Sequence, residues 1–238
     1  MITSTRLAEH VLAGALFFAA AAPTPAPTPR AATGTATATA AASATVTPDA
    51  VWTPPADFHA KVDAACGSAG EKFGACFIDQ MRAAGAPEAA LAFSRRTDGQ
   101  GYATAFLDTG KVDVAYAEYP FRANENALVF LVNGEPPSID VDDLSRIDMK
   151  NLGNNPVYVG LLRTFPSLAL FPGDRRPGGR EPRAVKLRSG GQRFVVVFEL
   201  HDGCHACKTV GYARIGFDFD VQGKFVGTDV VQVRPRYQ

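Results

Sequence analysis

The chain has 238 residues, with 24 basic and 24 acidic side chains, so its formal net charge at neutral pH is zero. This balance provides no general attraction to nucleic acid or to an anionic membrane, and we expect neither as a partner. The length is sufficient for one domain with a sizeable core, and four cysteines in an exported chain indicate two disulfides.

The N-terminus has the features of a secretory signal peptide. Arg6 supplies a positive charge, residues 11–22 are apolar or small, and the alanines at 19–21 provide a cleavage site. The apolar run is shorter than the about 20 residues that a bilayer requires, although an uncleaved anchor is the alternative. The sequence therefore predicts a signal peptide over residues 1–21, export to the periplasm or beyond the cell, and no stable membrane span after processing.

The next segment, residues 22–50, consists almost entirely of alanine, threonine and proline. Such a composition offers too little apolar surface to offset the entropy of ordering, so it predicts a disordered tether. The remaining residues, 51–238, contain all four cysteines and are expected to form a single globular domain.

The first part of this domain, residues 56–95, has helical periodicity. One helix is expected after Asp57, and a second after Ser68, which forms a Ser-x-x-Glu capping box with Glu71. A third helix is expected from Pro87 to Phe93. The apolar residues at helical spacing on the first two helices are Phe58, Val62, Cys66, Phe73, Cys76, Phe77 and Met81.

From residue 102 the pattern changes to the alternation typical of β-strands. The second strand, with Val112, Val114 and Tyr116 alternating with small or polar residues, is expected to be half-buried, and Gly227 marks an expected bulge in the last one. The sequence predicts an α+β fold with N-terminal helices (56–95) packed on a largely antiparallel β-sheet meander (102–234), stapled by disulfides. The expected strands are 102–107, 112–117, 127–132, 157–162, 168–171, 194–200, 213–220 and 225–233.

Four cysteines allow three pairings, of which the local one is the simplest. A bond between Cys66 and Cys76 would join the first two helices across their short connection. A bond between Cys204 and Cys207 would close a tight turn between two strands, where Gly203 gives the backbone its freedom.

The stretch around this second pair is the most reactive part of the sequence. His201, Cys204, His205 and Cys207 are side chains that bind zinc or copper, although the adjacent Cys204 and His205 are poorly placed to share one ion. A thioredoxin-like site is excluded because a strand, not a helix, follows the cysteines. Attached haem is disfavoured because Lys208 replaces the required histidine. A structural turn, a redox disulfide and a metal site remain.

Two further loops carry polar side chains that a ligand could contact. Arg122, Asn124 and Glu125 lie between two expected strands and form a candidate binding loop. The stretch 175–193 is rich in basic residues and proline, which indicates an exposed surface that could meet an anionic polymer or lipid headgroups. Its basic residues are Arg175, Arg176, Arg180, Arg183, Lys186, Arg188 and Arg193.

An acidic run at residues 140–143 resembles the start of a calcium loop. Ser145 and Asn151 stand where such a loop needs glycine and glutamate, so a calcium site is disfavoured. The run predicts instead the acidic N-terminus of a short helix at residues 144–149.

The sequence contains no strand–helix–strand alternation, no glycine-rich phosphate loop and no nucleophile elbow, so we expect no dependable enzyme active site. It favours an exported, non-enzymatic domain that binds a protein partner or a component of the cell envelope. The alternative is a metal-binding or thiol–disulfide redox-responsive protein that acts through His201, Cys204, His205 and Cys207.

Overall fold

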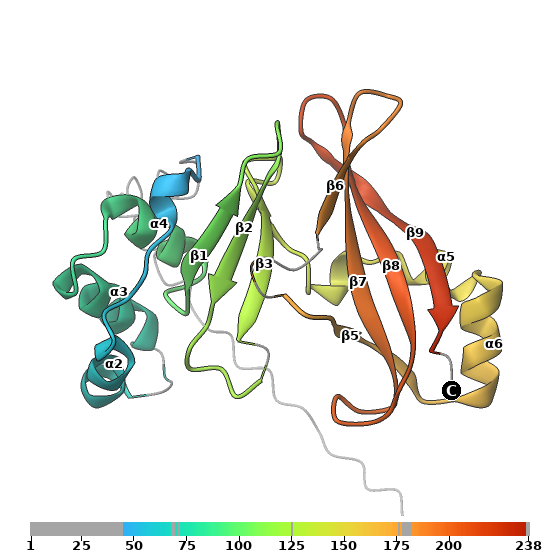
Figure 1. Cartoon of the computed structure of the whole chain (residues 1–238), viewed down its shortest axis with the longest axis horizontal. Coiled ribbons are helices and arrows are strands. Elements are labelled where there is room, and N and C mark those ends of the chain that lie inside the picture. The colour runs from blue at the N-terminus through green and yellow to red at the C-terminus, as the bar shows by residue number, and fades with distance from the viewer. Residues whose placement is uncertain are drawn as a thin grey trace, which may run out of the picture. The chain divides into compact units, whose positions relative to one another are not determined.

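The computed structural model describes residues 45–67, 70, 72–124, 126–175, 177 and 182–236 (Figure 1). The expected signal peptide, the expected tether up to residue 44 and the capping-box residues Ser68 and Glu71 lie outside the described residues. Within the described part, no helix is both long enough and apolar enough to cross a membrane.

Helices come first and two antiparallel sheets follow, which confirms the α+β class. The expected single meander is divided in two, because short helices separate the sheets. The first sheet has the order β1-β2-β3-β4, and the second has the order β5-β7-β8-β9, with β6 also paired to β7.

The bounds of the elements up to the end of the first sheet are η1 (Pro48–Ala50), α2 (Phe58–Cys66), α3 (Phe73–Ala83), α4 (Glu88–Arg96), β1 (Tyr102–Leu107), β2 (Asp113–Glu118), β3 (Ala127–Val132) and β4 (Ser138–Asp140). Those that follow are η2 (Leu144–Arg146), α5 (Met149–Gly153), α6 (Pro156–Thr164), β5 (Leu168–Pro172), β6 (Arg183–Lys186), β7 (Gln192–Asp202), β8 (Thr209–Phe219) and β9 (Phe225–Pro235).

The first two long helices are joined as the sequence predicts. Cys66, at the end of α2, is bonded to Cys76 in α3, with 5.7 Å between their Cα atoms. Asp57 precedes α2, but its side chain does not cap the helix. It accepts from Lys61 one turn later, with 2.7 Å between Nζ and Oδ2, and this interaction lowers the pKa of Asp57. Helix α2 therefore begins where expected and is stabilised differently.

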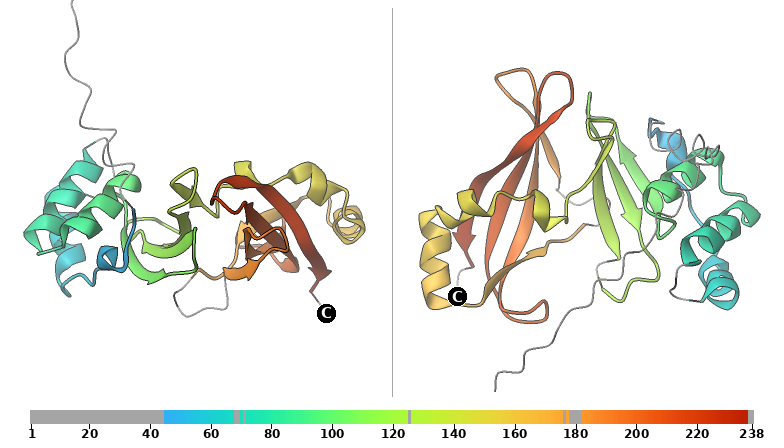
Figure 2. Two further views of the ribbon diagram at one scale, coloured as in Figure 1. Left: turned by 90° about the horizontal axis from the view of Figure 1, so that it is seen from above. Right: turned by 180° about the vertical axis from the view of Figure 1, so that it is seen from behind.

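Strand β2 is buried on both faces, which corrects the expectation of a half-buried strand. Val114 and Tyr116 belong to a core cluster that also contains residues of the second sheet. Ala115 and Ala117 face a different cluster with Phe93 of α4, and the helices lie on this face of the sheet (Figure 2). Large and small residues therefore alternate along β2 because both of its faces are packed. The large side chains fill the core shared with the second sheet, and the alanines on the other face leave room for the helices.

The folded part starts earlier than the expected tether boundary at residue 50. Val46 is 5% exposed and Ala50 is 2% exposed, and both pack in the cluster between α4 and the first sheet. Asn133 fixes this segment from the sheet, since its side chain accepts from the backbone N–H of Val46 at 2.7 Å and donates to the carbonyl of Val46 at 2.8 Å. The last residues assigned to the tether are therefore part of the domain.

The expected strand at 157–162 is wrong, because these residues form α6. The side chain of Asn155 accepts from the backbone N–H groups of Val157 and Tyr158 at 3.0 and 3.2 Å, and Pro156 occupies the first turn. Asn155 and Pro156 therefore start a helix, although the apolar run that follows them resembles a strand. Tyr158 and Leu161, at helical spacing, are the positions that pack on the core.

The acidic run begins a helix as predicted, but the expected helix at 144–149 is divided into η2 and α5. Asp143 caps η2 by accepting from the backbone N–H of Ser145 at 3.0 Å. Asp148 caps α5 in the same way, accepting from Lys150 and Asn151 at 3.0 Å each. A second capping aspartate five residues later therefore starts a new helix.

The second sheet contains the predicted bulge. In the β8–β9 ladder, Asp218 is opposite Gly227 and Phe219 is opposite Phe225, so Val226 has no partner. Gly227 has a φ of 137°, which a residue with a side chain rarely adopts. Val226 is consequently turned outward and is 63% exposed.

Candidate functional site in the β7–β8 hairpin

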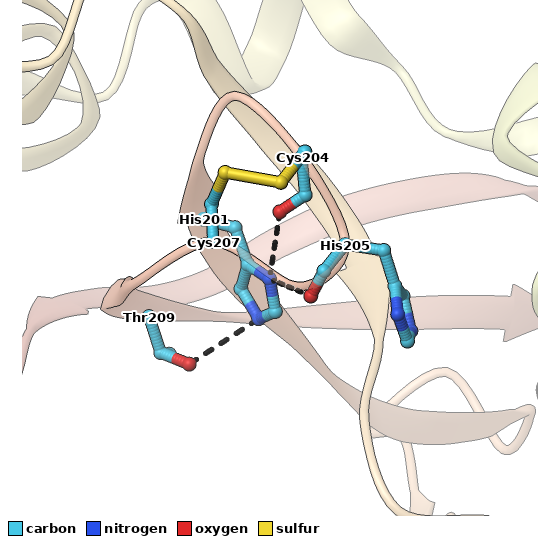
Figure 3. The surroundings of a disulfide bond; sticks show 5 residues. All are labelled: His201, Cys204, His205, Cys207 and Thr209. Carbon is cyan, nitrogen blue, oxygen red and sulfur yellow. Dashed lines mark hydrogen bonds between the residues drawn. A yellow bond between two sulfur atoms is a disulfide. The ribbon is translucent and has the colours of Figure 1, made fainter.

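The turn between β7 and β8 contains the second disulfide (Figure 3). Cys204 and Cys207 are bonded, with 4.9 Å between their Cα atoms, as the local pairing predicts. Gly203 has a φ of 97°, so the expected backbone freedom is used. Cys204 is exposed, whereas Cys207 is partly buried. We call this turn, residues 203–208, the Cys–His hairpin, and its disulfide can be reached from solvent.

A buried histidine lies directly beneath the turn. His201 is 6% exposed, and its Nδ1 lies 3.3 Å from the carbonyl oxygen of Cys204 and 2.9 Å from that of His205 (Figure 3). Carbonyl oxygens only accept, so Nδ1 carries a proton and donates to both. The imidazole of His201 therefore holds the backbone of the turn and does not point a nitrogen at the sulfur atoms.

The opposite nitrogen of this ring meets a carboxylate and a hydroxyl. The Nε2 of His201 is 2.8 Å from Oε2 of Glu199 and 3.3 Å from Oγ1 of Thr209, and Thr209 also donates to Glu199 at 3.2 Å. Nδ1 and Nε2 can both donate to these acceptors only when the ring carries two protons. In that form His201 and Glu199 are an ion pair under the hairpin.

The sequence creates this arrangement through the pleat and the register of the sheet. Glu199 and His201 are two residues apart on β7 and therefore share a face. His201 is opposite Thr209 of β8 after a register shift between Leu200 and His201. Phe171 of β5 packs on the ring of His201, with 4.8 Å between the centroids.

Sequence reasoning identified His201 but missed its partners. The alternation along β7 could have indicated Glu199, since residues two apart share a face. Thr209 and Phe171 depend on the register of two ladders and have no local signal.

The four candidate metal ligands do not form one ligand set. Cys204 and Cys207 are bonded to each other, and both nitrogens of His201 are engaged by the protein. The ring of His205 makes a T-shaped contact with that of Phe171, with 5.4 Å between the centroids. Throughout the part of the chain that the structure describes, no three histidine, cysteine, aspartate or glutamate side chains are grouped to hold a metal ion. With Cys204 and Cys207 oxidised, the reactive group of the hairpin is the disulfide itself.

The candidate binding loop belongs to the first sheet, between β2 and β3. Arg122 lies over the ring of Tyr119, 4.5 Å from its centroid, and Asn124 is exposed. Glu125 lies outside the described residues. Burial raises the pKa of Tyr119 to about 12, so this ring presents a neutral face to the guanidinium. Arg122 is thus held by its own loop.

Two of the predicted charged stretches meet in the fold. Arg175 is only 4% exposed, which corrects the expectation that the whole basic stretch is a surface loop. Its Nε and Nη2 donate to Oδ1 of Asp142 at 2.9 and 2.7 Å, and its Nη1 donates to the carbonyl of Val197 at 2.8 Å. Burial raises the pKa of the neighbouring Asp140 to about 6. This cluster has a structural role between the two sheets.

The other basic residues of the stretch have different environments. Arg193 is paired with Asp218, with 2.6 Å between Nε and Oδ1, and with Asp229 at 3.1 Å. Arg183, Lys186 and Arg188 are exposed, whereas Arg176 and Arg180 lie outside the described residues.

Comparisons of the chain with known protein families, with curated proteins and with solved structures found no match. The chemistry of the hairpin is therefore the guide to function. It consists of one solvent-reachable disulfide in a turn whose shape is also held by a buried histidine.

Proposed function

We propose that the protein is an exported thiol–disulfide redox protein that acts through the Cys204–Cys207 bond. The observation that carries this proposal is that His201 holds the turn independently of the sulfur atoms, through the carbonyls of Cys204 and His205. The N-terminal sequence supports export, as do two disulfides, which persist in oxidising compartments.

A purely structural role gives a weaker account of this bond. Closing a loop of this size contributes about 2 kcal/mol by loop entropy, less than a longer loop would. The turn is already closed by hydrogen bonds, from Cys207 N to the carbonyl of Cys204 at 3.0 Å and from Asp202 N to that of Lys208 at 3.1 Å. These contacts use the backbone and do not depend on the disulfide. Reduction therefore leaves the two thiols close together, in a geometry from which the bond can form again.

The reaction is an exchange of two electrons. A thiolate of a partner dithiol attacks one sulfur of the Cys204–Cys207 bond, whose electron pair leaves on the other sulfur as a thiolate. The second partner thiolate then attacks the mixed disulfide, which releases the oxidised partner and the reduced hairpin. Lys208, exposed next to Cys207, adds positive charge near the thiolate that forms.

The test is equilibration of the full mature chain in glutathione buffers of graded potential, followed by alkylation and mass spectrometry. We expect Cys204 and Cys207 to be reduced and reoxidised reversibly above about −300 mV, the region below which structural disulfides lie. Cys66 and Cys76 should remain bonded and the fold intact. Reduction of the hairpin only after unfolding would contradict the proposal, and the Cys204→Ser/Cys207→Ser variant is the control.

Metal binding is tested on the same samples. We expect no free thiol in the hairpin of aerobically purified protein and less than one zinc or copper ion per chain, because thiolates are needed as ligands. Near-stoichiometric metal that is lost in His201→Ala or His205→Ala would replace the redox proposal with a metal site.

Export has its own measurement. Cleavage after Ala21 should leave a mature chain that begins near Ala22, with a loss of about 2 kDa, as a signal peptide of this length predicts. Mass spectrometry of the exported protein decides this, and recovery of intact Met1 in the membrane fraction would support an uncleaved anchor.

The hypothesis of a domain that only binds a partner stays a prediction. It requires that the Cys204→Ser/Cys207→Ser variant binds its partner and supports the function of the protein in the cell as well as the parent chain does.

A further inference from the structure

A groove of about 290 Å³ lies beside the Cys–His hairpin. Its apolar lining includes Leu161 of α6 and Phe165, the residue that ends this helix. The same groove is lined by Lys208 and Thr209, which lead from the hairpin into β8, and by Arg236 after β9. Three segments that are distant in the sequence therefore meet around one concave surface.

The groove combines an apolar lining with positive charge. Lys208 and Arg236 are exposed at its edge, and none of the described residues that line it carries a carboxylate. The volume is at the lower end of the range for small-molecule pockets, so it suits one or two side chains of an extended peptide better than a large ligand. Charge complementarity favours a peptide that carries an acidic residue beside a leucine-sized or phenylalanine-sized one.

The groove is connected to the disulfide by the chain itself. Lys208 lines the groove and follows Cys207 directly. Thr209, the next residue, lines the groove and contacts both Glu199 and His201 beneath the turn. A peptide held in the groove therefore contacts the residue that directly follows Cys207, which is one position along the chain from the Cys204–Cys207 bond.

We infer that this groove docks the thiol substrate of the hairpin, an extended polypeptide segment in which a cysteine adjoins an apolar and an acidic side chain. This inference rests on the proposed redox function. Docking places the thiolate of the peptide against the Cys204–Cys207 bond, forms a mixed disulfide and leaves a thiolate on the protein. A second thiol of the substrate then resolves the mixed disulfide, and both electrons reside on the hairpin.

The experiment compares reduction of the full mature chain by three thiol peptides of matched length. Their sequences are Glu-Leu-Cys, Lys-Leu-Cys and Glu-Gly-Cys, each blocked at both ends, with 2-mercaptoethanol as a thiol too small to use the groove. Each rate is divided by the rate of the same thiol with a model disulfide, which removes differences in intrinsic reactivity. We expect Glu-Leu-Cys to exceed Lys-Leu-Cys by about tenfold at low salt, and by less at high salt.

Charge reversal is the decisive variant. In Lys208→Glu/Arg236→Glu the preference should invert in favour of Lys-Leu-Cys, while Lys224→Glu, a change of exposed charge in the β8–β9 turn, should leave it unaltered. Leu161→Ala should bring Glu-Leu-Cys down to the rate of Glu-Gly-Cys.

The outcomes separate the two proposals. Equal corrected rates for all peptides, with no inversion in the charge-reversed chain, would remove the groove and leave the redox function standing. Failure of every thiol, including 2-mercaptoethanol, to reduce the hairpin of the native chain would overturn both.

Discussion

The two disulfides of this protein differ in the length of the loop that they close and in their exposure to solvent. Cys66–Cys76 spans 10 positions and joins two helices; both cysteines are partly buried, and Cys66 packs against an aromatic cluster with Phe58 and Phe77. Cys204–Cys207 spans 3 positions in a solvent-exposed turn that His201 also holds. We therefore expect the bond that closes the longer loop to contribute more to stability, and the bond in the exposed turn to be the one that a reductant reaches first.

Loop entropy gives the comparison a scale. Closing the helical loop is worth about 3 kcal/mol and closing the hairpin about 2 kcal/mol. Both values describe the freedom that each bond removes from the unfolded chain, so the longer loop gives the larger effect.

The largest effect should come from the helical bond. Replacing Cys66 and Cys76 with alanine should lower the free energy of unfolding by about 2–4 kcal/mol, because the unfolded chain regains the loop freedom. Urea denaturation of the oxidised chain measures the loss, and circular dichroism should still show the strands. A loss smaller than that of the matched Cys204→Ala/Cys207→Ala pair would reverse the comparison.

The pH of these measurements matters because of Asp140. Burial raises its native pKa from 3.8 to about 6. Between about pH 4 and pH 6 the native chain holds a proton that the unfolded chain releases, so the free energy of unfolding falls as the pH rises through this window. Asp140→Asn can still accept from the backbone N–H of Asp142 and should be more stable than the parent above pH 6 by about 1–3 kcal/mol.

Below about pH 4 the two chains should be equally stable, since Asp140 is then neutral in both states. Carboxylates with a lowered pKa, such as Asp143, lose their stabilisation only in this more acidic range and act equally in both chains. The difference between the two urea midpoints as a function of pH isolates Asp140, and a constant difference across the range would show that its carboxyl titrates normally.

The hairpin bond comes next in size. Cys204→Ser/Cys207→Ser should lower the free energy of unfolding by about 2 kcal/mol or less, with the native fold retained. Mild reductant should open this bond in the parent chain while the helical bond persists, which differential alkylation and mass spectrometry detect. Reduction of Cys66–Cys76 first would contradict the contrast in exposure between the two sites.

Features that depend on residues close together in the sequence could be predicted, and those that depend on distant residues could not. The helices α2 and α3, the strands β5, β7, β8 and β9 and both disulfides depend on periodicity and short spacings, and the sequence predicts them. The short strand β6 lies in the basic stretch that the sequence predicts as an exposed loop, and it was missed. Helix α6 was missed because a run of valines and leucines outweighed the local start at Asn155 and Pro156. The Arg175–Asp142 pair and the contacts of His201 with Glu199 and Thr209 join distant elements or depend on register, which composition cannot supply.

The smallest effect on stability, and the sharpest test of the hairpin, concerns His201. His201→Leu removes the donor to two turn carbonyls and leaves Thr209 as the remaining donor to Glu199, so we expect a loss of about 1–2 kcal/mol in the free energy of unfolding. The kinetic effect should be larger. Without the donor the reduced turn opens, the two thiols separate, and re-formation of the Cys204–Cys207 bond should slow by about tenfold, as their effective concentration falls.

The matched control for this change is His205→Ala. Only the backbone carbonyl of His205 accepts from His201, and that group is unchanged by the substitution, so re-formation should keep close to the parent rate. Stopped-flow oxidation of the reduced chain, followed by thiol titration, measures both variants. Equal slowing in His201→Leu and His205→Ala would contradict a role that is specific to the hydrogen bonds donated by His201. An unchanged rate in His201→Leu would mean that the backbone hydrogen bonds of the hairpin suffice by themselves.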